Sequence, residues 1–588
     1  MRGLTRRWLM HGVNAEGTSR GLVERVLLAR GVVDADEMLR FCEPKLSHLH
    51  DPSLLPGADA AAERLVAALK RDEQIVIFGD YDVDGITASA ILYHTIRTAK
   101  PEARLRTYVP HRLEEGYGIN CEALRQLRRE GAQLIISVDC GITAVESAAT
   151  AREIGVDLIV TDHHNAREDG VLPDALVLVH PRLPHNAGSS NAGFYPFPDL
   201  CGAGVAFKLA WRFATLWCGS ERVSEVMQKT LLAMLPLAAL GTIADVVPLV
   251  GENRIITTFG LRLIKQTPLV GLRALIEASD LASENIDCEK VGFVLGPRLN
   301  ACGRLGHAGD AVRLLTDAPP DEARQIAAKL ARVNRDRQRT EREILALAMR
   351  LAEDSGMTGD DTRAIVLAHE QWHPGVVGIV CSRLVDRFSR PTVLMQRNGE
   401  FCKGSARSID GYSIHGGLSA CAELLTTFGG HDMAAGLTLP IGNLSAFVEA
   451  LTSHANAHVE KGQLTPAIHI DCDASLTEID ELTVRRMMTL SPFGRANRRP
   501  LLRVNGAEVI ETPKQMGQQG KHLSLRLRQP DASGDKARLG MRAVWWDAGR
   551  FAGDIAAGMR LDVAIEPKLN EWNNRMNVEA EIKDVRVV

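Results

Sequence analysis

What the sequence lacks excludes several classes of protein. Its 11 cysteines never occur as C-x-x-C, are odd in number and are scattered along the chain. This favours reduced, buried thiols over disulfides or a thiolate-bound zinc ion. No apolar stretch reaches the roughly 20 residues of a membrane helix, and the N-terminus, with Arg2, Arg6 and Arg7 before a short mixed segment, lacks the long apolar region of a signal peptide. We expect a cytoplasmic protein that does not bind a membrane.

A surplus of positive charge is also missing. The net charge is −4, so no overall basic field attracts nucleic acid, and any such binding must come from local groups of Arg and Lys. The apolar fraction of 45% is ordinary for a globular protein, but 588 residues are too many for a single hydrophobic core. Length and composition therefore predict roughly three or four domains.

Acidic residues and histidines follow three apolar runs of strand length. The runs cover residues 75–78, 134–138 and 158–161, and helix-like segments cover 88–97, 121–130 and 144–154. This is the spacing of βαβ units in a parallel sheet, and an open α/β sheet binds its ligands at the carboxyl ends of its strands. The residues at these ends are Asp80, Asp82, Asp84 and Gly85, then Asp139, Cys140 and Gly141, then Asp162, His163 and His164.

These residue types suit a particular kind of metal site. Carboxylates with one or two imidazoles are ligands for hard to borderline cations such as Mn²⁺ or Mg²⁺. Asp245, further along the chain, offers another carboxylate. Two such ions, about 3.5–4 Å apart, can activate a water and stabilise the leaving oxygen of a phosphoester. The pattern therefore indicates hydrolysis of a phosphoester by two divalent metals.

Two other interpretations of these residues have to be weighed. The pattern D-x-D-x-D-G also opens an EF-hand calcium loop, which needs Glu at its twelfth position, where this chain has Ile91. The segment before the motif is a predicted strand and the segment after it a predicted helix, whereas an EF-hand loop lies between two helices. A lone Asp–His pair is more often a satisfied hydrogen bond than a metal site. Several clusters that each follow an apolar strand favour the metal.

The motifs resemble those of the DHH phosphoesterases. Asp80, Asp82 and Asp84 match the first motif, Asp139-Cys140-Gly141 the second, and Asp162-His163-His164 the third, which gives the family its name. The segment from Gly241 to Asp245 is similar to the fourth motif, and the segment from Gly296 to Arg304 resembles the one that follows it. Segments 372–378, 404–408 and 429–436 are similar to the accessory DHHA1 domain.

The resemblance covers almost the whole chain, and it is strongest with the branch formed by single-strand-specific 5′-to-3′ DNA exonucleases. It implies an α/β fold, with a parallel-sheet DHH domain joined by a long helix to an α/β DHHA1 domain. It also implies a phosphodiester hydrolase that uses two divalent ions, Mn²⁺ or Mg²⁺, and releases 5′-mononucleotides in DNA repair and recombination.

The resemblance further implies roles for individual residues. Asp82 and Asp84 would each hold one metal, with Asp139 bridging the two ions. His163 and Asp245 would complete the second site. Asp80 and His164 would complete or orient the first. His164 has a second interpretation, as the donor of a proton to the leaving oxygen. The predicted catalytic residues are therefore Asp82, Asp84, Asp139, His163, His164 and Asp245, with Asp80 as a further metal ligand.

A second group of residues is expected to bind phosphate or DNA. By resemblance it comprises Arg112, Arg298, Asn300, Arg304, Ser405, Arg407, Gly430 and His431. Glycines at such positions allow backbone N–H groups to approach phosphate oxygens. From the residues alone, however, the glycine-rich pieces at 404–405 and 429–430 would read as turns. Arg112 would bind the 5′ end, and an ordinary surface arginine is an equally reasonable interpretation.

Arginines also concentrate along a segment from about Asp321 to Ala352 that reads as one long helix. They are Arg332, Arg335, Arg337, Arg339 and Arg342. Glu341 and Glu343 are local charge partners, as expected of a solvated helix face. We favour a helix that bridges two domains, with some of its arginines meeting DNA.

A sharper concentration lies between Arg485 and Arg503, where six arginines and Phe493 occur without an acidic residue. Short alternating runs and turn signals follow, which suggest a small β-barrel. An OB-fold, which binds single strands with a basic groove and stacking aromatics, is the candidate for this region. Trp545, Trp546 and Trp572 could be part of the barrel core instead, and we expect at most one of them to stack on a base.

The predicted division of the chain is an N-terminal extension (1–50), the DHH domain (51–318), a linking helix (319–358), the DHHA1 domain (359–462) and an OB-like domain (463–588).

Two rival functions share parts of this pattern. One is a DHH phosphodiesterase for short oligonucleotides or cyclic dinucleotides, and the arginine-bearing tail speaks against it. The other is a non-catalytic single-strand-binding replication factor, and the intact acidic motifs speak against that.

The resemblance implies single-stranded DNA with a free 5′ end as the substrate. Single-strand-binding protein and a DNA helicase are the implied partners, and we expect the chain to act as a monomer.

Overall fold

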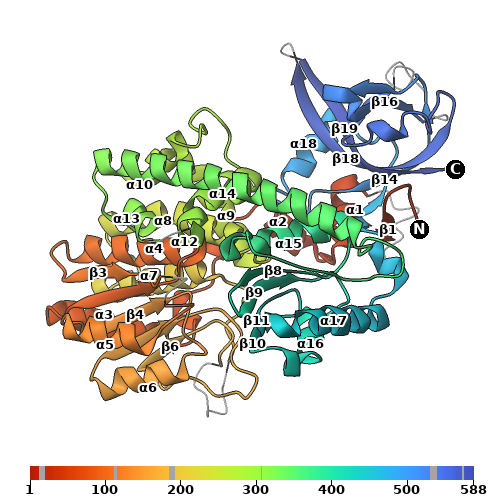
Figure 1. Cartoon of the computed structure of the whole chain (residues 1–588). Coiled ribbons are helices and arrows are strands. Elements are labelled where there is room, and N and C mark those ends of the chain that lie inside the picture. The colour runs from red at the N-terminus through yellow and green to blue at the C-terminus, as the bar shows by residue number, and fades with distance from the viewer. Residues whose placement is uncertain (12–19, 112–114, 185–192, 306–307, 530–539, 573–574) are drawn as a thin grey trace. The chain divides into compact units, whose positions relative to one another are not determined.

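The structure is a computed structural model that describes residues 1–11, 20–111, 115–184, 193–305, 308–529, 540–572 and 575–588 (Figure 1). The chain divides into two compact units. The parallel-sheet unit consists of Arg40–Arg337 and a short later piece, Ser491–Arg498. The barrel unit consists of Met1–Leu39, Gln338–Leu490 and Arg499–Val588.

The parallel-sheet unit is built on five parallel strands in the order β3-β2-β4-β5-β6. Hydrophobic residues occupy both faces of the central strands, as expected of a sheet that is covered by helices on both sides. The strands are β2 (Ile75–Gly79), β3 (Leu105–Tyr108), β4 (Leu134–Val138), β5 (Asp157–Thr161) and β6 (Val177–Val179).

Side-chain alternation along the strands sorts the helices into two layers. Ile75 and Ile77 of β2 pack into the core that contains α3, α4, α7 and α8, whereas Val76 and Phe78 face the core that contains α5 and α6. The helices of this unit are α3 (Ala58–Lys70), α4 (Val83–Ala99), α5 (Cys121–Arg129), α6 (Val145–Glu153), α7 (Gly202–Cys218), α8 (Glu225–Ala244), α9 (Gly251–Leu263), α10 (Val270–Glu277), α11 (Cys288–Lys290), α12 (Gly296–Leu305) and α13 (Gly309–Thr316).

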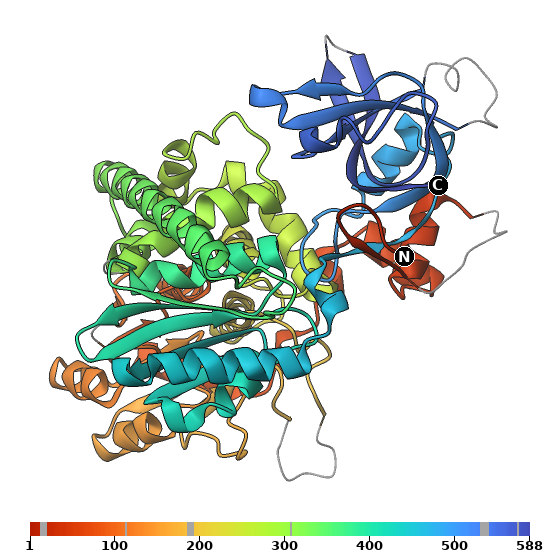
Figure 2. The same cartoon turned by 45° about the vertical axis from the view of Figure 1, so that its right-hand side comes forward.

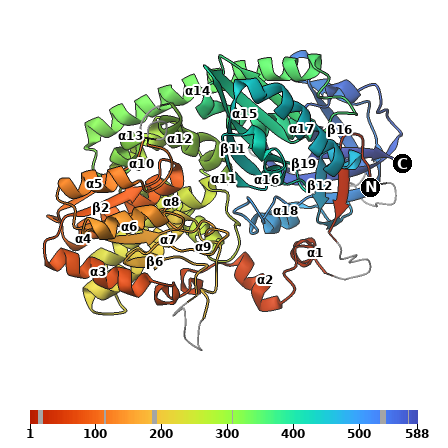
Figure 3. The same cartoon turned by 60° about the horizontal axis from the view of Figure 1, so that its bottom comes forward.

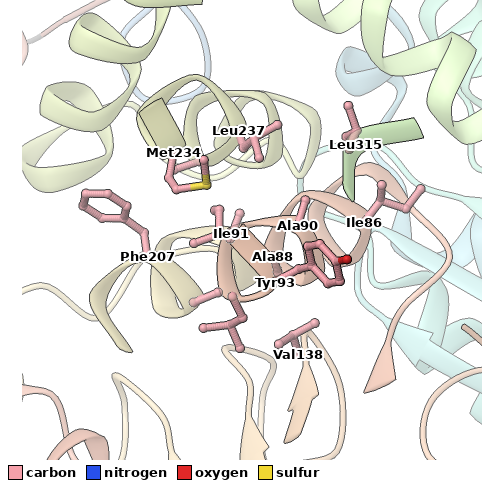
Figure 4. Packing of buried hydrophobic residues seen from close by; sticks show 14 of the residues in the cluster. Ile86, Ala88, Ala90, Ile91, Tyr93, Val138, Phe207, Met234, Leu237 and Leu315 are labelled. Carbon is pink, nitrogen blue, oxygen red and sulfur yellow. The ribbon is translucent and has the colours of Figure 1, made fainter. Parts of the chain in front are cut away.

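Helix α4 is the centre of the larger core. Figure 4 shows Ile91 of α4 near Phe207 of α7, Met234 of α8 and Leu237 of α8. Helix α8 has the length and apolar composition of a membrane span, but 61% of its most apolar stretch is buried inside the protein. Its apolar surface is therefore accounted for by packing against α4 and α9.

The barrel unit contains a mixed five-stranded sheet in the order β10-β11-β9-β8-β7, in which only β7 and β8 are parallel. Helices α15 and α17 pack on it, and Figure 3 shows this region in green and teal. The elements are β7 (Ile365–His369), α15 (Pro374–Phe388), β8 (Thr392–Asn398), β9 (Phe401–Arg407), α16 (Ile414–Ser419), β10 (Thr427–His431), β11 (Ala434–Pro440) and α17 (Leu444–His458).

The C-terminal strands of the barrel unit close on themselves. The sheet order β13-β14-β18-β19-β17-β16-β15 is joined by a further pairing of β14 with β16, which closes a five-stranded barrel (Figure 2). The elements are β12 (Ala467–Ile470), β13 (Cys472–Asp473), α18 (Glu481–Met488), β14 (Leu502–Val509), β15 (Lys514–Met516), β16 (His522–Arg528), β17 (Met541–Trp545), β18 (Arg560–Trp572) and β19 (Arg575–Val587).

The N-terminal residues belong to the barrel unit. Strand β1 (Arg7–Met10) pairs in parallel with β12, and α1 (Leu22–Ala29) is followed by α2 (Ala35–Cys42). Arg30, just after α1, makes a two-pronged ion pair with Asp471 at 2.8 and 3.0 Å. The first residues of the chain are thus held by residues more than 400 positions away.

The predicted long helix is confirmed as α14 (Pro320–Asp354), and the boundary between the two units falls inside it, after Arg337. Arg337 is buried, with its Nε and Nη2 atoms 3.2 and 3.0 Å from Asn334 Oδ1. Glu341 accepts a hydrogen bond from Arg383 of α15. These contacts show that part of the charged pattern on this helix serves packing.

A buried carboxylate holds the N-terminal segment. Asp584 of β19 is fully buried and accepts hydrogen bonds from Thr5 N, Thr5 Oγ1, Arg6 N and Trp8 Nε1 at 2.8–3.0 Å. Trp8 itself is 1% exposed. One carboxylate therefore satisfies four donors that would otherwise be left unpaired.

We expect Asp584→Ala to destabilise the barrel unit by about 3 kcal/mol or more, because it leaves the buried indole N–H and two backbone N–H groups without an acceptor. Thermal unfolding and hydrogen exchange of residues 1–10 measure the effect. Asp554→Ala, at an exposed aspartate of the same unit, is the control. Unchanged exchange at Trp8 would show that Asp584 does not hold the segment.

Candidate metal centre

The first acidic motif forms the turn between β2 and α4. Asp80 follows the strand directly, and Asp82 caps the helix by accepting hydrogen bonds from Asp84 N (2.9 Å) and Gly85 N (3.2 Å). This cap starts the helix at Val83, several residues earlier than the apolar pattern predicts. Asp84 and Gly85 therefore lie in the first helical turn, with Asp84 only 1% exposed.

A second helix stabilises Asp84. Its Oδ2 atom accepts a hydrogen bond from Gly202 N at 2.6 Å, and its Oδ1 atom accepts one from Ala203 N at 2.8 Å. Both donors lie at the start of α7, where the free N–H groups and the helix dipole favour a negative charge. The charge on Asp84 is thus stabilised by backbone groups even though the side chain is buried.

Glycines allow the carboxylates to come together. A Cβ atom on Gly202 would lie 2.5 Å from Asp139 Oδ1, and one on Gly241 would lie 2.4 Å from Asp84 Oδ1. Both distances are too short for any larger residue to fit without displacing a carboxylate. The helices α7 and α8 approach the acidic residues this closely because each presents a glycine there.

His163 stands among the carboxylates. Its Nε2 atom lies 3.2 Å from Asp139 Oδ1, 3.6 Å from Asp245 Oδ2 and 3.8 Å from Asp84 Oδ2. Within the part of the chain that the structure describes, His163 Nε2 and Asp139 Oδ1 are buried and make no hydrogen bond. Buried polar atoms without partners are costly. A cation between them would satisfy both, so the residues present fit a metal.

Three groups of ligand atoms within 4.8 Å of one another could each hold a cation. They are Asp139 with His163 and His164, Asp84 with His163 and Asp245, and Asp80 with Asp82 and Asp139. Asp139 and His163 each occur in two of the groups. The arrangement brings together every metal ligand that the sequence predicts, and oxygen and imidazole ligands suit Mn²⁺ or Mg²⁺.

Burial and mutual repulsion change the acidity of these groups. Burial, followed by the charges on Asp84 and Asp82, raises the pKa of Asp139 well above its ordinary value. Burial is also the main cause that raises the pKa of Asp84. Burial and the same two neighbouring charges raise the pKa of Asp245 to about 8, with His164 and Arg495 acting in the opposite direction. The ionised cluster needs a compensating positive charge.

The two histidines of the third motif differ in charge. Burial lowers the pKa of His163 to about 4, so its ring is neutral at pH 7 and keeps a lone pair for a metal. Burial acts the same way on His164, but a 2.7 Å hydrogen bond with Asp162 raises its pKa to about 9. His164 therefore carries a proton at neutral pH.

Asp162 organises this motif. Burial would raise the pKa of Asp162, but hydrogen bonds from the ring of His164 and from backbone N–H groups lower it to about 2. Its Oδ2 atom accepts a hydrogen bond from Ile142 N at 2.9 Å, and its Oδ1 atom accepts one from His163 N at 2.7 Å. Asp162 thus binds the backbone of His163 and the ring of His164, and it is in none of the groups of possible metal ligands among the described residues.

A cavity of about 260 Å³ opens beside the cluster. Its walls are formed by Asp80, Tyr81, Asp82, Tyr117, Ala244, Asn300 and Arg304. The rings of Tyr81 and Tyr117 are 6.3 Å apart at nearly right angles, and the Tyr117 hydroxyl lies 3.4 Å from His164 Nδ1. The cavity combines carboxylates, aromatic walls and an arginine, whose guanidinium is a donor that suits a phosphate group.

Sequence reasoning missed several of these residues. Tyr81 and Tyr117 line the cavity. Tyr81 lies inside the first acidic motif, where the sequence gives it no role, and Tyr117 occurs in no motif. Gly202 and Ala203 bind Asp84, and the only signal for them is the small-residue run Cys201-Gly202-Ala203-Gly204 before an apolar helix. The sequence places Asp162 in the third motif but indicates no role for it.

The phosphate-binding candidates of the parallel-sheet unit have different surroundings. Asn300 and Arg304 line the cavity, and Asn300 Oδ1 also accepts a hydrogen bond from Val83 N at 3.0 Å, which ties α12 to the start of α4. Arg298, on the same helix, donates to Val294 O at 2.7 Å. Arg112 lies outside the described residues.

Three candidates of the barrel unit, Ser405, Arg407 and His431, share one face of the mixed sheet, whereas Gly430 pairs with Ala435 at a position of the other face. In register, Arg407 of β9 and His431 of β10 both pair with Ala434 of β11, and Ser405 pairs with Gly436 two residues further on. Side chains at paired positions point to the same face. A Cβ atom on Gly378 of α15 would lie 3.3 Å from Ser405 Oγ, so this helix covers the same face closely.

Gly429 and Gly430, which read as a turn in the sequence, instead lie in strand β10, where Gly430 has a φ of +141°. This backbone conformation favours glycine. The sequence around Gly429 could not show whether it forms a turn or a strand, because the strand is defined by its pairing with β11.

The basic run between Arg485 and Arg503 is not one continuous groove. Arg485 pairs with Glu481, Arg499 with Glu566 and Arg503 with Asp473, so acidic residues outside the run neutralise half of its six arginines. The piece Ser491–Arg498, which contains Arg495, belongs to the parallel-sheet unit.

The tryptophans of the barrel also differ. Trp545 is 4% exposed and stacks on Phe551 with ring centroids 5.1 Å apart, so it is core. Trp546 is 49% exposed, with His522 at its ring. Of these two, Trp546 is the one whose ring is accessible, and base stacking by one tryptophan stays a prediction. The side chain of Trp572 lies outside the described structure.

Family models match three parts of the chain: the DHH family N-terminal domain at residues 74–242, the DHHA1 domain at 361–457 and the RecJ OB domain at 470–584. The single-stranded-DNA-specific exonuclease RecJ of Bacillus subtilis is 38% identical over 96% of this chain and 68% of its own length. RecJ of Thermus thermophilus is 34% identical over 91% of this chain and 72% of its own length.

Solved structures agree with these matches. The crystal structure of Thermus thermophilus RecJ in complex with Mn²⁺ is similar with a TM-score of 0.79 and 29% identity, over 99% of this chain and 80% of that chain. The same protein in complex with Mg²⁺ gives a TM-score of 0.73 at 28% identity, over 99% of this chain and 79% of that one.

A parallel sheet with clustered carboxylates and a His163-His164 pair at its strand ends defines a metal-dependent phosphoesterase of the DHH class. A DHHA1 domain and an OB domain follow in this chain. The chain belongs to the RecJ family of single-stranded-DNA-specific exonucleases. The expected fold class, the divalent-metal cofactors and the exonuclease class are confirmed.

The raised pKa of Asp245 predicts how metal binding depends on pH. A cation must displace the proton that Asp245 holds up to a pH of about 8, so the apparent Mn²⁺ affinity should rise with pH up to that value and level off above it. Calorimetric titration at several pH values measures this. Asp245→Asn should bind Mn²⁺ more weakly and with a flatter pH dependence.

The metal-free protein should show the opposite trend in stability. Because the folded state keeps protons that the unfolded chain releases above its ordinary carboxyl pKa of 3.8, stability should fall as the pH rises from there towards 8. Glu63→Gln, at an exposed glutamate of the same unit, should change neither profile. A Mn²⁺ affinity that is independent of pH would contradict the assignment of Asp245.

Proposed function

We propose that this chain is an exonuclease that hydrolyses the phosphodiester bonds of single-stranded DNA from the 5′ end with two divalent metal ions, and releases 5′-mononucleotides. The observation that carries the proposal is the cluster of buried carboxylates around the neutral His163, beside a cavity that also contains Arg304. Membership of the RecJ family supports the choice of a single DNA strand as the substrate.

The residues proposed to hold the two ions are Asp80, Asp82, Asp84, Asp139, His163 and Asp245. Asp139 occurs in two of the three ligand groups, which supports its role as the bridging ligand. When bound, two divalent ions supply an activated water and Lewis-acid stabilisation of the leaving oxygen. The chain itself holds the ligands in place through the cap at Asp82 and the start of α7.

His164 is proposed to act on the substrate and not as a metal ligand. Its hydrogen bond with Asp162 keeps the ring protonated at neutral pH and places a proton donor beside the carboxylates. Such a donor can protonate the leaving oxygen or bind a phosphate oxygen. The Tyr117 hydroxyl, 3.4 Å from the same ring, is in a position to orient it.

Residues proposed to bind phosphate occur in each unit. In the parallel-sheet unit, Asn300 and Arg304 line the cavity, and Arg298 lies on the same helix, α12. Ser405, Arg407, Gly430 and His431 lie on the mixed sheet of the barrel unit. Arg112 is proposed to bind the 5′ end. The arginines of these sets supply the bidentate donors that phosphate groups favour.

The proposed enzyme comprises three domains and acts on strands that other proteins expose. The DHH domain (51–318), the DHHA1 domain (359–462) and the OB-like domain (463–588) form the working enzyme, with Trp546 of the last as the exposed aromatic for base stacking. We propose a cytoplasmic monomer that acts in DNA repair and recombination, after a helicase has exposed a 5′ strand and together with single-strand-binding protein.

Asp139→Ala should abolish cleavage of single-stranded DNA and leave strand binding largely intact, because Asp139 joins two ligand groups but does not line the cavity. The assay uses end-labelled strands with the 5′ or the 3′ end blocked in turn, in Mn²⁺, Mg²⁺ or a chelator, and a parallel gel-shift measurement. Asp169→Ala is the surface control. Retained turnover would remove Asp139 from the site.

The same assay separates the rival functions. Release of mononucleotides only when the 5′ end is free supports the proposal. Cleavage of dinucleotides but not of long strands would point to a small-substrate phosphodiesterase, and binding without cleavage in every metal would point to a replication factor.

A further inference from the structure

Helix α8 ends in an unusual conformation beside a proposed metal ligand. Asp245 is the C-cap of the helix, and the next residue, Val246, has a φ of +58°. A left-handed residue commonly ends a helix, but it is usually glycine. For a β-branched side chain this conformation is a genuine outlier, and it persists only where the surroundings enforce it.

The side chain of Val246 does not supply that enforcement. It is 57% exposed, so little burial of apolar surface compensates for the backbone strain. The backbone after Asp245 is held by other groups. On one side, Asn253 of α9 is fully buried and donates from Nδ2 to Pro248 O at 3.0 Å and to Asp199 O at 2.6 Å.

On the other side, Arg495 holds the same segment at two points. Leu249 N donates to Arg495 O at 2.9 Å, and Arg495 Nη1 donates to Val246 O at 3.3 Å. The carbonyl of the strained residue is therefore bound by the arginine side chain, and the end of the segment is bound by the arginine backbone.

The turn that carries Arg495 is itself well defined. Gly494 and Asn497 exchange backbone hydrogen bonds at 2.8 and 3.2 Å. Asn497 is fully buried, and its Nδ2 atom donates to Pro492 O at 2.8 Å. A Cβ atom on Gly494 would lie 2.7 Å from Leu249 Cδ1, so the turn packs directly on the segment that it holds.

This turn comes from a distant part of the sequence. Residues Ser491–Arg498 belong to the parallel-sheet unit, whereas the chain on either side of them, up to Leu490 and from Arg499, belongs to the barrel unit. A piece of the C-terminal region is thus built into the catalytic unit, at the residue that follows a proposed metal ligand.

We propose that Arg495 is a positioning residue for the exonuclease reaction: its turn clamps Val246 in the left-handed conformation and thereby fixes the carboxylate of Asp245. The inference rests on the proposed function, since it takes Asp245 as a metal ligand. It assigns to one arginine of the basic run a task other than binding DNA.

Three variants test the clamp. Arg495→Gln removes the side-chain bond to Val246 O, and Asn497→Ala loosens the whole turn. Arg222→Gln removes an exposed charge elsewhere in the same unit and is the matched control. We expect Arg495→Gln to lower kcat about three- to tenfold, the scale of one hydrogen bond, with KM for a single strand unchanged, and Asn497→Ala to lower kcat further. Arg222→Gln should match the parent protein.

Rescue by Val246→Gly is the decisive measurement. Glycine adopts the left-handed conformation without strain, so it should make the clamp dispensable and restore most of the kcat that Arg495→Gln or Asn497→Ala has lost. Arg495→Lys, which keeps a donor, should lose less kcat than Arg495→Gln. If Arg495→Gln instead raises KM in a salt-dependent manner and Val246→Gly does not rescue it, Arg495 contacts DNA and the proposal is overturned.

A measurement without substrate keeps this test apart from the proposed function. In thermal unfolding, Arg495→Gln should lower the melting temperature of the parent protein less than that of the Val246→Gly protein, because an unclamped valine can relax from the strained conformation and glycine has no strain to release. In Mn²⁺ titration, Arg495→Gln should weaken binding more in the parent protein, since only there does the segment after Asp245 move. Equal shifts in the two backgrounds would overturn the clamp. If the parent protein degrades no DNA, the proposed function fails, and the unfolding comparison still decides the role of Arg495.

Discussion

The crowding of negative charge around Asp84 is the constraint on which the rest of the catalytic unit depends. Several carboxylates are buried within a few ångströms of His163, and burial with mutual repulsion raises the pKa of three of them. The unit stabilises this arrangement with the N-terminus of α7, whose first N–H groups bind Asp84. Glycines in α7 and α8 leave the space that the carboxylates occupy.

Strained backbone conformation occurs at two places in this site, at one proposed metal ligand and directly after another. Asp139, at the end of β4, has a φ of +61°, and Val246, just after α8, has a φ of +58°. Both lie in the left-handed region, which polar residues such as Asp tolerate and β-branched residues do not. Strain of this kind collects at functional sites, because the surrounding fold must hold a catalytic group where an unconstrained chain would not place it.

Contacts between distant parts of the chain recur throughout the protein. Asp584 holds the first ten residues through Thr5 and Trp8, and the turn that carries Arg495 holds the end of α8. In both places a hydrogen-bonding group from the C-terminal region fixes a segment more than 200 residues earlier in the chain. The C-terminal region therefore contributes to the folding of the rest in addition to forming a barrel.

Local patterns were enough to predict three strands of the parallel sheet, the acidic residues that gather at their ends and the long helix. Apolar runs end at Gly79, Val138 and Thr161, and the acids follow at once, because side-chain periodicity and strand ends are properties of short segments. The resemblance to DHH phosphoesterases supplied the roles. Only the folded chain shows Gly202 beside Asp84, Tyr117 beside His164 and Arg495 beside Val246, since these contacts join residues with no shared local pattern and arise from packing between elements.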